Sequence, residues 1–550
     1  MLTTADKWRI WLLLLAICTL LIALVGLVFR YLIHARASVV ESAPPRLIPN
    51  TDFNPFGANF FLQWEAEPFK RAKTVEMAAQ AGIGWAKQQF PWDDIEPSPG
   101  QYRWDKYDDI VNLYRKHGLQ VIARLDRPPD WTREDNRFPE RPPDDFNDYG
   151  DFVEELVHHF KDRVRYIQIW NEPNIFPEWG DQPVDPAAYT QLLGVAYRSA
   201  KSVDPNIYVL SAPLAINLED FPARRNLSDL VFLEEMYQAG AADYFDILSA
   251  NAFGMDRRPE DSPDPDVLNF RRVELQREIM LRYGDGDKPI WFDEYGWNAA
   301  PENFPPDKLI WQRVSEEQQA RWTVEGIRWA RAHWPWAGVF NIWYFRQIGN
   351  LSPNRADYYF RMVDVDFTPR RVYYAVQQAT LDVNLAHPGY HQETAPAVTA
   401  DNNWRPRIEP QASARADIVA SARGATLTFT FSGTGVDLIA HRGPEGGQLA
   451  ATIDGKPVPG LLRDGDGRSI VDLTASQPTW QSRTTLARDL PAGRHTLRLT
   501  LVVGEAAIDG FVVPLDNTPT LPLTPIAGCV FGLVAAGWFL YREVARITQV

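Results

Sequence analysis

The feature that most constrains the fold is a regular alternation of short apolar runs with helical stretches, which continues from Asn54 to about Asn384. The runs have the length and composition of buried strands, and they recur at the spacing of βα units. The predicted strands cover 54–61, 85–90, 120–126, 166–171, 207–212, 247–252, 289–294 and 337–343. Eight successive βα units predict a (β/α)8 barrel, the TIM-barrel fold, in which the chemistry occurs where the strands end.

The pattern changes after the proline-containing stretch 387–396. Apolar and polar residues then alternate with a period of two, most clearly in 426–431 and 497–501, and this period is typical of half-buried strands. Three Asp-Gly pairs provide turns between them. Residues 404–515 are therefore predicted to form a small all-β sandwich.

Each end of the chain carries an uncharged apolar stretch of membrane-spanning length, at 10–29 and at 521–541. Lys7 and Arg9 precede the first stretch and Arg542 follows the second, so the positive-inside rule predicts that both termini are cytoplasmic. A cleaved signal peptide is the alternative for the first stretch, and a buried core helix is the alternative for the second. Two membrane anchors would place the barrel and the sandwich on the extracytoplasmic side.

These patterns predict the boundaries of the domains. They are a cytoplasmic tip with a transmembrane anchor at 1–36, a linker at 37–53, the barrel at 54–386, a linker at 387–403, the sandwich at 404–515, a juxtamembrane segment with a transmembrane helix at 516–541, and a cytoplasmic tail at 542–550.

Composition excludes several classes of protein. The formal net charge of −15 is opposite to that of a nucleic-acid-binding surface, so no nucleic-acid partner is expected. Both cysteines, Cys18 and Cys529, lie in the apolar ends, so the region between them has no thiol for a disulfide, a thiolate metal site or a cysteine nucleophile. The histidines show no ligand-like pairing apart from the adjacent His158 and His159, which point apart on a helix. No metal site is expected.

Two glutamates stand at the ends of predicted strands on nearly opposite sides of the barrel. Glu172 follows the fourth strand, in the sequence Trp-Asn-Glu-Pro-Asn at 170–174, and Glu294 ends the seventh. Because the strand ends surround one mouth, both carboxyls are expected to face a shared cleft. Cleavage of a glycosidic bond needs two such groups, one protonated to release the leaving oxygen and one ionised to attack or stabilise the sugar carbon.

Residues 170–174 and the strand-ending Glu294 resemble the clan A glycoside hydrolases, and within them the cellulase-like and β-xylosidase/α-L-iduronidase-like families. The similarity covers about 56–379 and includes Trp343 after the eighth strand. It implies a barrel enzyme that retains anomeric configuration, with Glu172 as acid/base and Glu294 as nucleophile. It also implies that Asn171 holds the sugar 2-hydroxyl and that Trp343 forms the floor of the subsite on the nonreducing side of the cleaved bond.

The sequence departs from the clan pattern at two places. Lys87 lies where the clan usually has an arginine, and a lysine lacks the bidentate fork of that side chain. Asn251 and a following phenylalanine lie where the clan commonly has His and Tyr. We expect Lys87 and Asn251 to contribute to substrate binding. Trp92 and Trp297, near strand ends, are further candidates for binding sugars, with structural packing as their alternative role.

The sandwich resembles the jelly-roll domains that are appended to many carbohydrate enzymes, where it would brace the barrel or bind glycan. The leading hypothesis is a membrane-anchored retaining β-glycosidase that hydrolyses an extracytoplasmic oligo- or polysaccharide without a cofactor. Two alternatives remain open: a barrel that binds surface polysaccharide without cutting it, and a transglycosylase that remodels surface glycan.

Overall fold

The computed structural model describes residues 4–40, 54–219, 225–334, 336–349, 351–380, 384–386, 388–413, 416–514 and 523–548. The chain divides into two compact units. One consists of its two ends, Met1–Pro44 and Asp516–Val550, and the other of Pro45–Leu515. The larger unit has one main hydrophobic core in the barrel and another in the sandwich.

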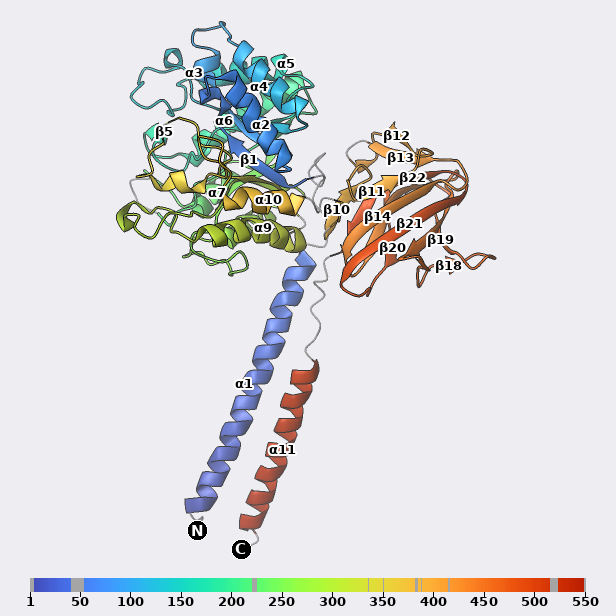
Figure 1. Ribbon diagram of the computed structural model, residues 1–550. Helices are drawn as coiled ribbons and strands as arrows, with labels where there is room; N and C mark the ends of the chain where they lie inside the picture. Colours follow the sequence, from blue (N-terminus) through green and yellow to red (C-terminus); the bar gives the residue numbers. More distant parts are fainter. Residues whose placement is uncertain are drawn as a thin grey trace. The chain divides into compact units, whose positions relative to one another are not determined.

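Eight parallel strands form the barrel (Figure 1). They are β1 (Phe56–Phe60), β2 (Trp85–Pro91), β3 (Gln120–Asp126), β4 (Tyr166–Ile169), β6 (Tyr208–Leu210), β7 (Leu248–Phe253), β8 (Ile290–Gly296) and β9 (Ala337–Ile342). Their order is β6-β4-β3-β2-β1-β9-β8-β7, and a parallel bridge between Leu210 and Ile247 joins the two outer strands. Each strand coincides with a predicted one, so the predicted TIM barrel is confirmed. A short extra strand, β5 (Glu178–Asp181), lies in the connection after β4 and was not predicted.

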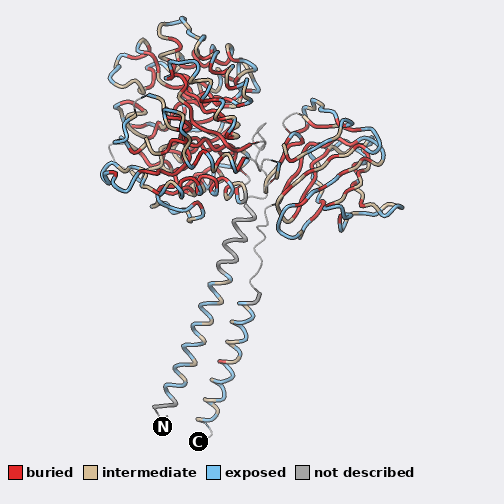
Figure 2. The backbone as a smooth tube through the Cα atoms, viewed as in Figure 1, coloured by how far each residue is buried: buried red, intermediate tan, exposed pale blue. Residues whose placement is uncertain are grey.

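Helices connect the strands and cover the outside of the barrel, while buried residues gather along the strands (Figure 2). The helices are α2 (Pro68–Gln80), α3 (Trp92–Ile95), α4 (Asp105–Lys116), α5 (Phe146–His159), α6 (Pro186–Val203), α7 (Asp229–Gln238), α8 (Val273–Arg282), α9 (Glu316–His333) and α10 (Arg371–Thr380). Side chains cap the N-termini of two of these helices. The Asp185 carboxylate accepts hydrogen bonds from the first N–H groups of α6, and Ser315 and Gln318 form a capping box on α9.

The inside of the barrel is layered because alternate residues of a strand point to the same side. The lowest layer is apolar, and in it the Trp85 ring contacts those of Tyr166 and Trp291, with centroids 5.1 and 5.0 Å apart. By the same alternation, the next layer is polar and consists of Lys87, Arg124, Gln168, Ser249, Asp293 and Asn341. In these six strands the change from an apolar to a polar interior therefore occurs within two residues.

The sandwich consists of two antiparallel sheets. One contains β12 (Arg405–Ile408), β13 (Ala416–Ala420), β22 (Ala506–Val513), β15 (Val436–Arg442) and β20 (Thr479–Ala487) in this order, with β10 (Gly389–Gln392) paired to β22. The other contains β11 (Val398–Ala400), β14 (Thr426–Gly433), β21 (Gly493–Val503), β16 (Gln448–Ile453), β19 (Ser469–Asp472) and β18 (Leu462–Arg463), with β17 (Lys456–Pro457) paired to β16.

The two sheets enclose a core in which the rings of Phe429 and Phe511 stack 4.4 Å apart. The predicted β domain is thus confirmed, but part of the predicted linker 387–403 belongs to it. Residues 389–392 and 398–400 pair with its strands as β10 and β11. These strands are only three or four residues long, too short to show the alternation from which the other strands were predicted.

The terminal unit consists of α1 (Thr4–Val40) and α11 (Leu523–Thr548). Each contains a segment long and apolar enough to cross a membrane, Lys7–Val28 and Pro525–Thr548. The helices run antiparallel, since Arg9 bonds Glu543 at 3.2 Å while Leu20, further along α1, lies beside Gly532 on α11. Most of their apolar side chains are exposed, which the alternative of a buried core helix does not explain.

A buried ion pair between α7 and the start of α8 allows a test of the fold. Asp229 is fully buried and accepts hydrogen bonds from Arg272 (3.0 Å) and Gln276 (2.9 Å). We expect Asp229→Ala to lower the free energy of unfolding by about 3–5 kcal/mol, because it leaves the Arg272 charge buried and unpaired. Chemical denaturation of the full chain in detergent measures this.

The matched control is Glu234→Ala on the same helix. Glu234 pairs with Arg282 at the surface, where an ion pair contributes at most about 1 kcal/mol. Equal losses for the two variants would contradict the expectation.

Candidate active site

The two glutamates lie at the mouth of the barrel, where the strands end. Glu294 is part of β8 and 7% exposed, and Glu172 follows β4. The backbone around Glu172 is held in an uncommon conformation, with positive φ at Trp170 (73°) and Glu172 (41°). Such angles cost about 1–3 kcal/mol each for residues other than glycine and cluster at functional sites.

Hydrogen bonds compensate for this conformation. The Glu172 N–H donates to the carbonyl of Pro213 (3.1 Å), and the Trp170 indole N–H donates to the carbonyl of Glu178 (2.8 Å). Asn174, fully buried, donates to the carbonyl of Ala215 (2.8 Å) and accepts from its N–H (2.9 Å). The segment that carries Glu172 is therefore fixed by contacts on both sides of the residue.

Lys87 lies inside the barrel beside Glu294. Its ammonium group forms a buried ion pair with Asp293 and lies 3.8 Å from Oε1 of Glu294. Asp293 and Glu294 are consecutive, yet both reach Lys87, because β8 contains a bulge here: Phe292 pairs with Ala250, and Glu294, two residues on, pairs with the next residue, Asn251. The predicted substrate-binding residue Lys87 is thus a partner of the site's own carboxylates.

Asn251 binds the other glutamate. Its Nδ2 donates a hydrogen bond to Oε1 of Glu172 at 2.5 Å, and the residue is 2% exposed. Asn251 on β7 pairs with Glu294 directly after the bulge in β8. The two strands thus bring Asn251 to Glu172 and Glu294 to Lys87. The predicted residues Glu172, Glu294, Asn251 and Lys87 therefore form one connected group.

The two glutamates differ in how strongly they hold a proton. Burial raises the pKa of Glu294 to about 7, while the positive charge of Lys87 acts in the opposite direction. Burial raises the pKa of Glu172 well above its usual range, and the negative charge of Glu294 adds to this increase. Glu172 is therefore the group that keeps its proton at a pH where Glu294 ionises.

Sequence reasoning missed several charged residues of the mouth. Arg124 donates to Asp126 at 2.5 Å, and Asp126 also accepts from Gln89 at 2.8 Å. Glu178 lies on the unpredicted strand β5, and burial raises its pKa to about 7. Arg124 and Asp126 could have been found from the sequence, because they are polar residues two positions apart at the end of a predicted strand. No sequence pattern pointed to Glu178.

Three buried polar atoms of the predicted site have no hydrogen-bond partner in the part of the chain that the structure describes: Oδ1 of Asn171, Oδ1 of Asn251 and the indole nitrogen of Trp343. Buried polar groups are nearly always paired, so unpaired ones near two carboxyls are suited to the hydroxyl groups of a ligand. Trp343 is also half-buried, with its ring against the edge of Phe61 at 5.5 Å.

The other two predicted sugar-binding aromatics lie in the core. Trp92 is completely buried, stacks on Phe152 at 5.2 Å and donates its indole N–H to Glu96. Trp297 is 1% exposed, and its indole N–H donates to the carbonyl of Arg257. Neither ring has a free face for a sugar, so packing, the alternative role, describes both.

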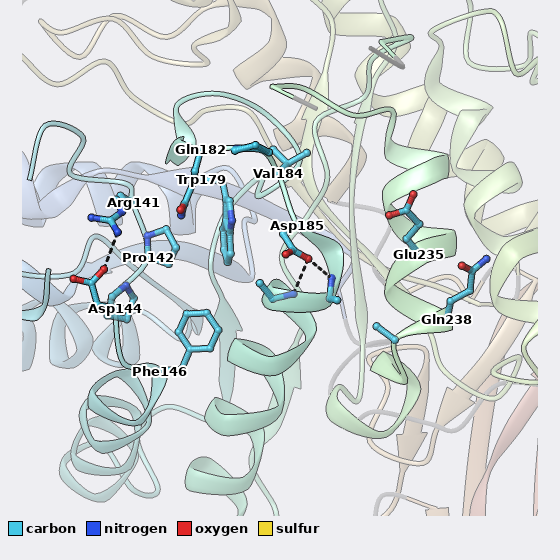
Figure 3. A pocket seen from close by; sticks show the side chains of 15 residues that line it. Arg141, Pro142, Asp144, Phe146, Trp179, Gln182, Val184, Asp185, Glu235 and Gln238 are labelled. Atoms are coloured by element: carbon cyan, nitrogen blue, oxygen red, sulfur yellow. Dashed lines mark hydrogen bonds and ion pairs between the residues drawn. The ribbon is translucent and has the colours of Figure 1, made fainter. Parts of the chain in front are cut away.

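A pocket of about 940 Å³ lies between the start of α6 and the end of α7 (Figure 3). Neither glutamate of the mouth lines it. Its Asp185 caps α6, and its Arg141 is paired with Asp144 at 2.7 Å. Because these charges are already paired, the group formed by Glu172, Glu294, Asn251 and Lys87 is the stronger candidate site.

Comparison with known proteins agrees with this geometry. Residues 59–152 match the model of glycoside hydrolase family 42, described as β-galactosidase. A β-xylosidase of Geobacillus stearothermophilus is 37% identical over 75 residues, which are 12% of this chain and 14% of that protein. These two matches confirm the resemblance to clan A glycoside hydrolases, although the matched segment is a small part of the relative's length.

Two solved structures are similar at low sequence identity. A family 39 glycoside hydrolase from Bacteroides cellulosilyticus is 17% identical, with 83% of this chain and 82% of that one covered and a TM-score of 0.46. An exo-β-1,4-mannosidase from an Opitutaceae bacterium is 16% identical, with 61% and 62% covered and a TM-score of 0.42.

The electrostatics of Glu294 predict a pH-dependent effect on stability. The unfolded chain releases this proton near pH 4.5 and the folded chain near 7, so the folded state loses stability as the pH rises between these values. We expect Glu294→Gln to raise the free energy of unfolding by on the order of 3 kcal/mol at pH 8 and by less than about 1 kcal/mol at pH 5.

Denaturation at both pH values measures the difference, with the surface variant Glu325→Gln on α9 as control. A gain of the same size at pH 5 and pH 8 would show that the raised pKa of Glu294 is not its cause.

Proposed function

We propose that this protein is a membrane-anchored, retaining β-glycosidase that hydrolyses O-glycosidic bonds of an extracytoplasmic oligo- or polysaccharide. The observation that carries the proposal is the pair of glutamates at the mouth of the barrel, of which Glu172 holds its proton more tightly than Glu294. Double displacement requires this division between a proton donor and an ionised nucleophile.

In the first step the Glu294 carboxylate attacks the anomeric carbon, and the bond to the leaving oxygen breaks while Glu172 gives that oxygen its proton. A glycosyl ester on Glu294 results. In the second step Glu172, now ionised, takes a proton from water, which attacks the same carbon and releases Glu294. The two inversions together retain the anomeric configuration.

Lys87 supports this assignment. A nucleophilic carboxylate in a buried site is ionised only if a positive charge compensates for the lost hydration. Lys87 supplies that charge 3.8 Å from Glu294, and Asp293 shares it. The lysine thus takes over one property of the arginine expected at this position, its charge, without the bidentate geometry.

Unpaired polar atoms suggest where the sugar binds. Oδ1 of Asn171 is available to accept a hydrogen bond from the sugar 2-hydroxyl, and the indole N–H of Trp343 is available to donate one. The half-buried Trp343 ring offers an apolar surface of the kind on which a sugar face packs.

Replacement of Glu172 is expected to lower the rate only for substrates whose leaving group must be protonated, whereas replacement of Glu294 is expected to stop cleavage of all of them. With aryl glycosides whose phenol needs protonation, we expect Glu172→Gln to lower kcat/KM by about 100- to 10,000-fold. With 2,4-dinitrophenyl glycosides, whose phenolate leaves without a proton, the loss in the first step is expected to be less than about 10-fold. Glu294→Gln should abolish turnover of both.

The control for these kinetics is Asp130→Asn, which changes a carboxylate that is 86% exposed. In parallel, the wild type is incubated with activated 2-deoxy-2-fluoro glycosides, and the adduct is located by peptide mass. An adduct on Glu294 is expected. Wild-type products longer than the substrate would instead favour a transglycosylase, and activity that survives Glu294→Gln would refute the assignment.

The antiparallel pair of apolar helices supports membrane anchoring. We expect the full chain to remain with membranes after extraction with alkaline carbonate, because two spanning helices are inserted in the bilayer. A chain limited to residues 39–516 should be soluble and should keep the kcat/KM of the full chain. Recovery of the full chain in the soluble fraction would contradict anchoring, and a mature N-terminus near residue 37 would identify a cleaved signal.

A further inference from the structure

Arg124 is a cation of the barrel interior to which the mechanism above gives no role. It lies on β3 two residues after Ile122, which belongs to the apolar layer at the base of the interior. Because alternate residues of a strand point to the same side, the Arg124 side chain also points inward. This side chain is 14% exposed. The apolar layer closes the interior below it, so the exposed part faces the mouth of the barrel.

One edge of the guanidinium is fixed by hydrogen bonds. Nε of Arg124 donates to Oδ2 of Asp126 at 2.5 Å, and Oδ1 of Asp126 accepts from the amide of Gln89 at 2.8 Å. The oxygen of Gln89 accepts in turn from Gln63 (2.9 Å), whose own oxygen accepts from Gln88 (2.5 Å). Gln89 and Gln63 are thus bonded through both oxygen and nitrogen, so neither amide is free to turn and Asp126 is held in place.

The other edge of the guanidinium is free. Neither Nη1 nor Nη2 of Arg124 donates a hydrogen bond to any residue that the structure describes. Each of these nitrogens carries two N–H groups. Burial opposes the charge of this guanidinium, but the negative charge of Asp126 and of two further carboxyls, Glu178 and Glu294, raises its pKa above the usual value. Four charged N–H donors are therefore available to a ligand in the mouth.

The shape and charge of this region indicate what the free edge binds. Its donors lie in one plane as a rigid fork, which suits two neighbouring oxygens, either of a carboxylate or of two adjacent sugar hydroxyls. Carboxyls outnumber cations around the fork, so a negatively charged sugar would be repelled and the hydroxyls of a neutral sugar are favoured. The cations are Lys87 and Arg124, and the carboxyls are Asp126, Glu172, Glu178, Asp293 and Glu294.

We propose that Arg124 binds the substrate: its free Nη groups donate to two adjacent hydroxyl oxygens of the sugar in the mouth of the barrel. This inference rests on the proposed glycosidase function and adds a residue that selects the substrate. Lys87, on the neighbouring strand β2, supplies a charge to Glu294 but has no fork. Arg124 supplies the fork from β3, so the two properties of one arginine are divided between two residues.

The test removes one hydroxyl from the substrate and one property from the arginine. The substrates are the 4-nitrophenyl β-glycoside of the sugar trapped on Glu294 and its monodeoxy analogues. The wild type is expected to lose about 10- to 100-fold in kcat/KM on the two analogues that lack a hydroxyl bound by Arg124. Arg124→Lys keeps the charge without the fork, so it should lose about 10- to 100-fold on the parent glycoside and less than about 3-fold more on these two analogues.

A second variant and a control accompany this test. Arg124→Gln replaces Arg124→Lys if the latter does not fold, because its amide is still able to donate to Asp126. It should show the same indifference to the two hydroxyls. The control is Arg163→Lys. Arg163 pairs with Asp108 and precedes β4, so it lies at the end of the barrel opposite to the mouth. This variant should cleave every substrate as the wild type does.

Two results would overturn the inference while leaving the proposed function intact. One is a set of deoxy penalties that is absent in the wild type or equally large in both Arg124 variants, because Arg124 would then bind no hydroxyl. The other is a wild type that prefers the 4-nitrophenyl β-glucuronide to the β-glucoside and loses this preference in Arg124→Lys, because the fork would then bind a carboxylate. A wild type that cleaves no glycoside and forms no adduct would refute the proposed function, and the inference with it.

Discussion

The ion pair between Lys87 and Asp293 stands at the centre of the barrel, and the rest of the site depends on it. Both side chains are almost completely buried, so each charge needs the other to compensate for lost hydration. Below them the rings of Trp85, Tyr166 and Trp291 close the interior against water. Above them lies Glu294, whose ionisation depends on the same ammonium group. A single cation thus compensates the charge of Asp293 and favours the ionised form of Glu294.

The two glutamates at the mouth of the barrel are supported in different ways. Glu294 belongs to a strand, and its neighbours are fixed by the barrel itself. Glu172 follows a strand, in a segment with two positive φ angles that is held by hydrogen bonds to Pro213, Glu178 and Ala215. The connection after β4 is therefore held both by β5, through Glu178, and by the segment after β6, through Pro213 and Ala215.

Much of this arrangement could be predicted from the sequence. The eight strands and both glutamates follow from the regular spacing of apolar runs and from the rule that barrels carry their chemistry at strand ends. The environment of Asn251 and Lys87 could not be predicted, because their partners, Glu172 and Asp293, are distant in sequence. Trp92 and Trp297 were ambiguous for a related reason: proximity to a strand end does not reveal whether a ring faces the mouth or the core. β5 is too short to show any period.

The bulge in β8 makes the length of this strand part of the site. Without the extra residue, strict alternation would direct Asp293 and Glu294 to opposite sides of the strand, and only one could reach Lys87. The inward orientation of both carboxyl groups therefore depends on the number of residues in the strand as well as on their identity. A deletion of one residue from β8 before Glu294 would remove the bulge, so that Asp293 and Glu294 could no longer both face Lys87.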